Sequence, residues 1–173
     1  MSNNWKLTRQ TFAFSACAML LINFIYLLSL IIWIGSIIFF SFITAPSLFK
    51  ALPPEFASKA IGAIFPKYYP VGYISGAFAF MSLIFHSAKT GIWSPLKMFL
   101  LIVMIALTLF ASLNIHPKAR ALKEEMQAAT DTIEHDHLKV EFDRVHKISV
   151  VYNGIVLLLG LILILITASN ITL

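Results

Sequence analysis

Charge is what this sequence has least of. Only 12% of its 173 residues are charged, against about 25% in soluble proteins. Apolar residues make up 59%, and the mean hydropathy is +0.85. Forty residues from Gln10 to Phe49 contain no charged side chain, and no proline interrupts them before Pro46. Because about 20 apolar residues cross a bilayer core, we expect this stretch to lie in a membrane.

Cysteine is also scarce, and its scarcity excludes several classes of site. Cys17 is the single cysteine, so the chain has no intramolecular disulfide and no multi-cysteine zinc or iron–sulfur site. Cys17 lies in the apolar run, where we expect it to be a small buried hydrophobe. Buried charge is missing from the apolar runs too, which disfavours an ion-coupled pump.

Four uncharged runs predict four transmembrane helices, and therefore an all-α polytopic membrane protein with a single domain over residues 1–173. The first run, within Phe12–Phe49, has no polar turn, so we expect one over-long helix. Ser94-Pro95 is a typical helix start. The proline-rich stretch Leu52–Pro70 predicts a loop with a short interfacial helix over Pro54–Phe65. The predicted spans cover about residues 20–45, 69–88, 95–115 and 148–168.

Residues 117–147 hold seven of the eight acidic side chains and have helical spacing of their apolar residues. They predict a helical hairpin that projects from the membrane between the third and fourth spans. Nine of the thirteen Lys and Arg follow spans one and three. The positive-inside tendency therefore favours a cytoplasmic hairpin with both termini outside, and we expect a bacterial inner membrane.

The net charge of +5 does not predict binding to nucleic acid. The basic residues flank the apolar spans, so the expected partners of these charges are the headgroups of membrane lipids. Nucleophilic serines, phosphate-binding glycine loops and paired catalytic carboxylates have no support in the sequence. We predict that the chain is not an enzyme.

Histidines are the remaining candidates for chemistry. His116 ends the third span and His146 precedes the fourth, so both should lie near one membrane face. Asn153 continues the helical stripe that begins at His146. If these stripes face each other, the two imidazoles are placed to bind haem or a metal, with Asn153 beside them. The alternative is that both histidines hydrogen-bond locally at the headgroup level. No third ligand or spacing motif defines a metal site.

Small residues predict where helices approach closely. Gly72 and Gly76 form a Gly-x-x-x-Gly pair, a pattern that lets a second helix pack tightly against the first. Gly35 offers the same to the first span. We favour packing within the chain, with contact between two copies as the alternative.

Five short motifs are distributed over most of the chain. They are Trp33-Ile34-Gly35-Ser36, Ala45-Pro46-x-x-Phe49, Leu52-Pro53, Phe65-Pro66-x-Tyr68-Tyr69 and Phe142-x-x-x-His146-x-x-Ser149-x-x-x-Asn153. Together they resemble the transmembrane protein 205-like family, and a more distant likeness is to copper-resistance D-type membrane proteins. The resemblance implies a four-helix membrane domain of unassigned function, with no catalytic residue to carry over. It draws attention to five positions that define the fold or a site: Trp33, Pro46, Phe65, His146 and Asn153.

These features lead to one functional hypothesis and two alternatives. We expect a non-enzymatic accessory or stabilising subunit of a larger membrane complex, with a membrane-protein partner or a second copy as its neighbour. The alternatives are a haem- or metal-binding membrane protein that uses His116 and His146, and a small exporter of a metal or solute.

Overall fold

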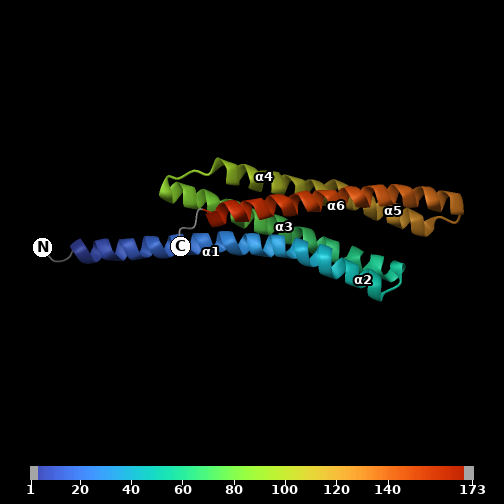
Figure 1. Ribbon diagram of the computed structural model, residues 1–173, viewed down its shortest axis with the longest axis horizontal. Helices are drawn as coiled ribbons and strands as arrows, with labels where there is room; N and C mark the ends of the chain where they lie inside the picture. Colours follow the sequence, from blue (N-terminus) through green and yellow to red (C-terminus); the bar gives the residue numbers. More distant parts are fainter. Residues whose placement is uncertain (1–3, 170–173) are drawn as a thin grey trace.

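The computed structural model describes residues 4–169, with side chains from Ser15 onward. In that part the helices join end to end into four rods: α1, η1 and α2 are continuous, and so are α4, η2 and α5 (Figure 1). Each rod is long and apolar enough to cross a membrane, which confirms the four-span, all-α prediction. The segments are α1 (Asn4–Ile38), η1 (Phe39–Thr44), α2 (Ala45–Ala51), α3 (Pro54–Thr90), α4 (Pro95–Phe110), η2 (Ala111–Ile115), α5 (His116–Ala128) and α6 (Thr132–Ser169).

The first rod is one over-long helix, as predicted. It runs from Asn4 to Ala51 and widens only over the π-helical segment η1. Both π-helical segments end two residues before a proline, η1 before Pro46 and η2 before Pro117. Proline has no N–H, and its ring clashes with a carbonyl of the preceding turn. We infer that the wider π turn relieves this clash and keeps each rod continuous.

The predicted loop over Leu52–Pro70 is wrong. The chain turns only around Pro53 and then forms α3, a single helix that contains both Pro66 and Pro70. Prolines are tolerated in such helices because neighbouring helices and local adjustments compensate for the lost hydrogen bonds. α3 ends at Thr90 and is capped by Gly91, whose φ of 70° is left-handed and whose N–H donates to the Ser87 carbonyl at 2.8 Å.

The two ends of the bundle differ (Figure 1). The α2–α3 turn and the α5–α6 turn lie at one end, and the α3–α4 loop lies at the other, toward which α1 begins and α6 finishes. α5 and the first half of α6 form the projecting hairpin that the sequence predicts. α1 starts well beyond the other helices, so part of it has no neighbouring rod.

Side-chain contacts between the rods mark two levels across the bundle. Phe40, Tyr69, His116 and Ser149 share the hairpin-side level, since Phe40 and His116 both contact Phe65 and Tyr69 lies within reach of Ser149.

The terminal-side level is marked by two contacts of α1. His86 Nδ1 is 2.9 Å from Asn23 Oδ1, and the Tyr26 hydroxyl is 3.3 Å from Thr167 Oγ1. On the three rods that carry residues of both levels, 14 to 18 positions separate them, or ~21–27 Å of helix. This is close to the ~30 Å thickness of a bilayer core.

The main core lies between these levels. Leu30, Trp33, Leu101, Met104 and Leu163, of α1, α4 and α6, are its largest fully buried side chains, and α3 contributes Ala79. Cys17 lies outside this core and is exposed. The expectation that it is buried is wrong because α1 extends past the other rods before it joins the bundle.

Candidate functional site

Trp33 organises the packing of α1 against α3. Its side chain is 1% exposed and its ring lies over the small-residue surface of α3. A Cβ added at Gly72 would meet Trp33 Nε1 at 3.1 Å, and one at Gly76 would meet Trp33 Cζ3 at 2.8 Å. The indole ring of Trp33 therefore packs against the Gly-x-x-x-Gly pair of the same chain. Gly35 has no atom within 4 Å of an added Cβ in the described part of the chain.

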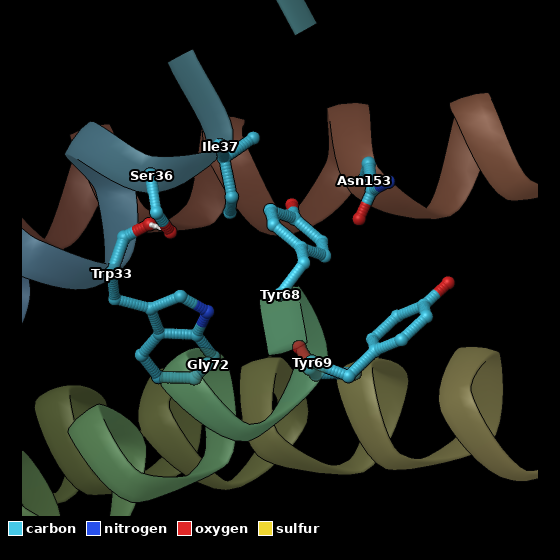
Figure 2. Close-up of a pocket in the computed structure, with 8 residues that line it drawn as sticks. Trp33, Ser36, Ile37, Tyr68, Tyr69, Gly72 and Asn153 are labelled. Carbon is cyan, nitrogen blue, oxygen red and sulfur yellow. Dashed lines mark hydrogen bonds between the residues drawn. The ribbon is translucent and has the colours of Figure 1, made fainter. Parts of the chain in front are cut away.

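A small cavity lies beside Trp33, close to the hairpin-side level. Its volume is about 10 Å³, which is room for about one water molecule. Figure 2 shows Trp33 and Ser36 of α1 at the left, Tyr68 of α3 in the centre, Tyr69 of α3 at the lower right and Asn153 of α6 at the upper right. The remaining lining residues are Ile37, Gly72 and Thr108.

The hydroxyls around this cavity are held mainly by their own helices. Ser36 Oγ donates to the Trp33 carbonyl at 2.7 Å, and Thr108 Oγ1 donates to the Met104 carbonyl at 2.9 Å. Asn153 contributes an amide, which is both donor and acceptor. The cavity thus has the polar lining that a single buried water needs, and it is too small for a cofactor ring.

His116 lies in an aromatic cluster rather than in a set of ligands. Its ring is 5.2 Å from the ring of Phe65 and 5.6 Å from that of Tyr69, between centroids. Phe65 also contacts Phe40 at 5.2 Å and Tyr68 at 6.0 Å. The cluster joins α3 to both η1 and α5 at the hairpin-side level, where aromatic side chains are typical of a membrane interface.

His146 has different neighbours. It is exposed and stacks on Phe142 of the same helix at 6.1 Å. Of the three predicted cofactor residues, Asn153 lies at the small cavity and His116 in the aromatic cluster, and no described contact links either of them to His146. Among residues 15–169, no group of three or more His, Cys, Asp or Glu is placed to hold a metal. The cofactor role of His116, His146 and Asn153 stays a prediction.

A second, larger opening runs along the contact between α3 and the η2–α5 junction. Its volume is about 270 Å³, and His116 lies in its wall. Arg120 is one helical turn further out and forms an ion pair with Glu124 at 2.8 Å. We call this opening the η2 groove; its lining residues are Pro66, Tyr69, Tyr73, Ser112, His116, Pro117 and Arg120.

Some important residues have no clear signal in the sequence. Gly160 of α6 lies against Ile34, and a Cβ added there would meet Ile34 Cδ1 at 2.7 Å. It stands alone in a leucine-rich run, without a second small residue four positions away. Thr108 was missed because it reads as part of a uniform apolar helix. The only available clue at both positions is a small or hydroxyl residue within an otherwise bulky apolar run.

Comparison with known proteins identifies a family. The family model described as domain of unknown function DUF4149 matches residues 28–128, more than half of the chain. The matched part begins within α1 and ends with α5, so it includes Trp33, the Gly72–Gly76 pair of α3 and the whole η2 groove. His146 and Asn153 lie outside it. No curated protein and no solved structure matches the chain.

Proposed function

We propose that this chain, which belongs to the DUF4149 family, is a non-enzymatic accessory or stabilising subunit of a larger membrane complex. The observation that carries the proposal is the length of α1. Asn23 lies at the terminal-side level, yet the helix starts at Asn4 and is free of charged residues from Gln10 onward. About 13 uncharged residues, or ~20 Å of helix, therefore precede the Asn23–His86 contact, and the start of α1 lies beyond the ends of the other helices (Figure 1).

Such an extension is unfavourable in water. Leu20 and Leu21 are 72% and 57% exposed, and exposed apolar surface costs about 25 cal/mol per Å². An apolar helix outside the bilayer core is stabilised when another protein covers it. The extension of α1 supports a membrane-protein partner that binds beside residues 15–21.

Cys17 gives a direct test, because it is the single cysteine and is exposed on this extension. We would attach a thiol-reactive photocrosslinker to Cys17 in native membranes, irradiate, and identify adducts by mass spectrometry. The proposal predicts one dominant protein adduct that also co-purifies in mild detergent. As a matched control, Cys17→Ala combined with Ile102→Cys moves the probe to an exposed position on α4 between the two levels, where lipid contact is expected.

The outcomes of this test are distinct. A dominant adduct at Cys17 that is absent at residue 102 supports an accessory subunit. Equal, diffuse labelling at both positions, together with a lone monomer in mild detergent, contradicts it. An adduct only with a second copy of the chain would replace the larger complex with a homo-oligomer.

The same preparation tests the two alternatives from the sequence. The haem- or metal-binding hypothesis is tested by an absorption spectrum with and without dithionite and by metal analysis. The resemblance to the transmembrane protein 205-like family, and the exporter role drawn from the copper-resistance likeness, stay predictions. Removal of the gene followed by measurement of metal and solute tolerance tests the exporter.

A further inference from the structure

The η2 groove lies where the rods change from uncharged to charged. Lys67 comes two residues before Tyr69, Lys118 two residues after His116, and Lys147 two residues before Ser149. Because Tyr69, His116 and Ser149 share the hairpin-side level, the first charged residues of three rods lie at nearly one depth. This depth corresponds to the headgroup layer of a bilayer.

The charges nearest to this level are basic. Lys67, Lys118 and Lys147 lie within a turn of it, and Arg120 lies one turn beyond His116. The nearest acids on the same rods, Glu124 and Asp143, lie further toward the hairpin tip. The groove therefore opens in a band of positive charge, although the hairpin as a whole also carries many acids.

The groove itself has a polar outer part and an aromatic inner part. Arg120 and His116 supply N–H donors at its outer part. Ser112 lies one turn inward from His116, and Tyr73 lies one turn inward from Tyr69. Along η2 and α5 the lining runs over about 8 residues, or ~12 Å, from the charged side into the uncharged side.

The helices on both sides of the groove are irregular where they line it. Ser112 belongs to the π-helical segment η2, and Pro117 removes one N–H from the helix just beyond it. Pro66 does the same on α3. π-helical segments occur frequently at functional sites, and here the segment places Ser112 and His116 in one groove.

We propose that the η2 groove binds the phosphate group of an anionic membrane phospholipid. Arg120 and His116 hold the phosphate, and the Ser112 and Tyr73 hydroxyls face the glycerol region. Arginine suits this role because its planar guanidinium binds phosphate oxygens in pairs. A lipid fits the groove better than free phosphate, because the groove continues inward into the uncharged part of the bundle and its volume of about 270 Å³ exceeds what one phosphate needs.

Glu124 competes with the lipid phosphate for Arg120, because the two side chains form an ion pair in the structure. Both side chains are well exposed, at 71% and 63%, so the pair contributes little to stability. Arg120 is therefore available to exchange Glu124 for a phosphate with small cost to the fold.

Native mass spectrometry of the detergent-solubilised full chain tests the proposal. The lipid probes are phosphatidylglycerol, phosphatidylcholine and diacylglycerol, and inorganic phosphate is the free-anion probe. We expect phosphatidylglycerol to bind most tightly. Arg120→Gln should weaken that binding about tenfold, as expected for loss of a hydrogen bond to a charged group. His116→Phe, which keeps a ring against Phe65, should weaken it as well.

Two matched variants give the test its specificity. Arg144→Gln removes the same charge from an exposed position on α6 that does not line the groove, and it should leave affinity within about twofold. Glu124→Gln removes the competitor and should leave binding equal or tighter. Three results would overturn the proposal: equal weakening by the Arg120 and Arg144 variants, no preference for phosphatidylglycerol over phosphatidylcholine, or Arg120-dependent binding of inorganic phosphate without binding of lipid.

Discussion

Trp33 of α1 fills the space that Gly76 of α3 leaves open. A Cβ at position 76 would lie 2.8 Å from Trp33 Cζ3 and 3.0 Å from Trp33 Cη2, closer than atoms in contact normally approach. The indole is almost completely buried and has little freedom to move. The absence of a side chain at Gly76 therefore fixes how closely the first and second rods pack.

Gly76→Ala should destabilise the bundle. The added methyl forces the Trp33 ring and Ile105 Cγ1, which is also 2.8 Å away, to shift. Overpacking of this kind costs about 1–3 kcal/mol. The measurement is reversible unfolding in mixed micelles containing a denaturing detergent, followed by circular dichroism. Gly35→Ala is the matched control, since no described atom lies within 4 Å of its added Cβ, and it should be neutral or slightly stabilising.

Gly160→Ala should destabilise the contact between α6 and α1. The nearest atoms to its added Cβ are Ile34 Cδ1 at 2.7 Å and Ile34 Cγ1 at 2.8 Å. Ile34 is 3% exposed, so the loss should again be about 1–3 kcal/mol. Gly154→Ala changes the same residue type in the same helix, where nothing lies within 4 Å. Equal stability of the two variants in the unfolding assay would contradict the packing described here.

The contrast between these glycines shows what the sequence can reveal. Gly72 and Gly76 were identified because a spacing of four places both on one helix face, which is a local property. Gly160 has no such partner, and its importance depends on Ile34 approaching from a helix 126 positions earlier in the sequence. Contacts of that range have no periodic signature in either helix.

The prolines show the same limit of local sequence patterns for the fold. Charge-free runs predicted the four rods, because membrane crossing depends on composition and length. Pro66 and Pro70 were interpreted as loop residues by the rules for isolated helices, yet α3 continues through both. Packing against α1 and α4 outweighs the local preference. The cavity beside Trp33 is likewise formed by side chains of all four rods. Motifs drew attention to most of its lining residues, but nothing in the sequence predicted that they share one cavity, and Ile37 and Thr108 had no signal.

The Asn23–His86 pair should couple α1 to α3 at the terminal-side level. The two side-chain atoms are 2.9 Å apart, and hydrogen bonds between helices in membranes contribute about 0.6 kcal/mol on average, up to ~1.7. A double-mutant cycle with Asn23→Ala and His86→Ala, measured by the same unfolding assay, isolates this term. We expect a coupling energy in that range. Strictly additive losses would show that the pair contributes nothing beyond packing.

The distribution of basic residues predicts the orientation of the chain in the membrane. Nine Lys and Arg lie on the hairpin side and four on the side of the α3–α4 loop, so the hairpin should be cytoplasmic. In a Cys17→Ala background, Ser94→Cys in the α3–α4 loop and Thr130→Cys at the hairpin tip place one thiol at each end. A membrane-impermeant maleimide added to intact spheroplasts should label residue 94 at once and residue 130 only after permeabilisation. The reverse pattern would place the η2 groove in the outer leaflet. The lipid probes for the groove would then be chosen from the lipids of that leaflet.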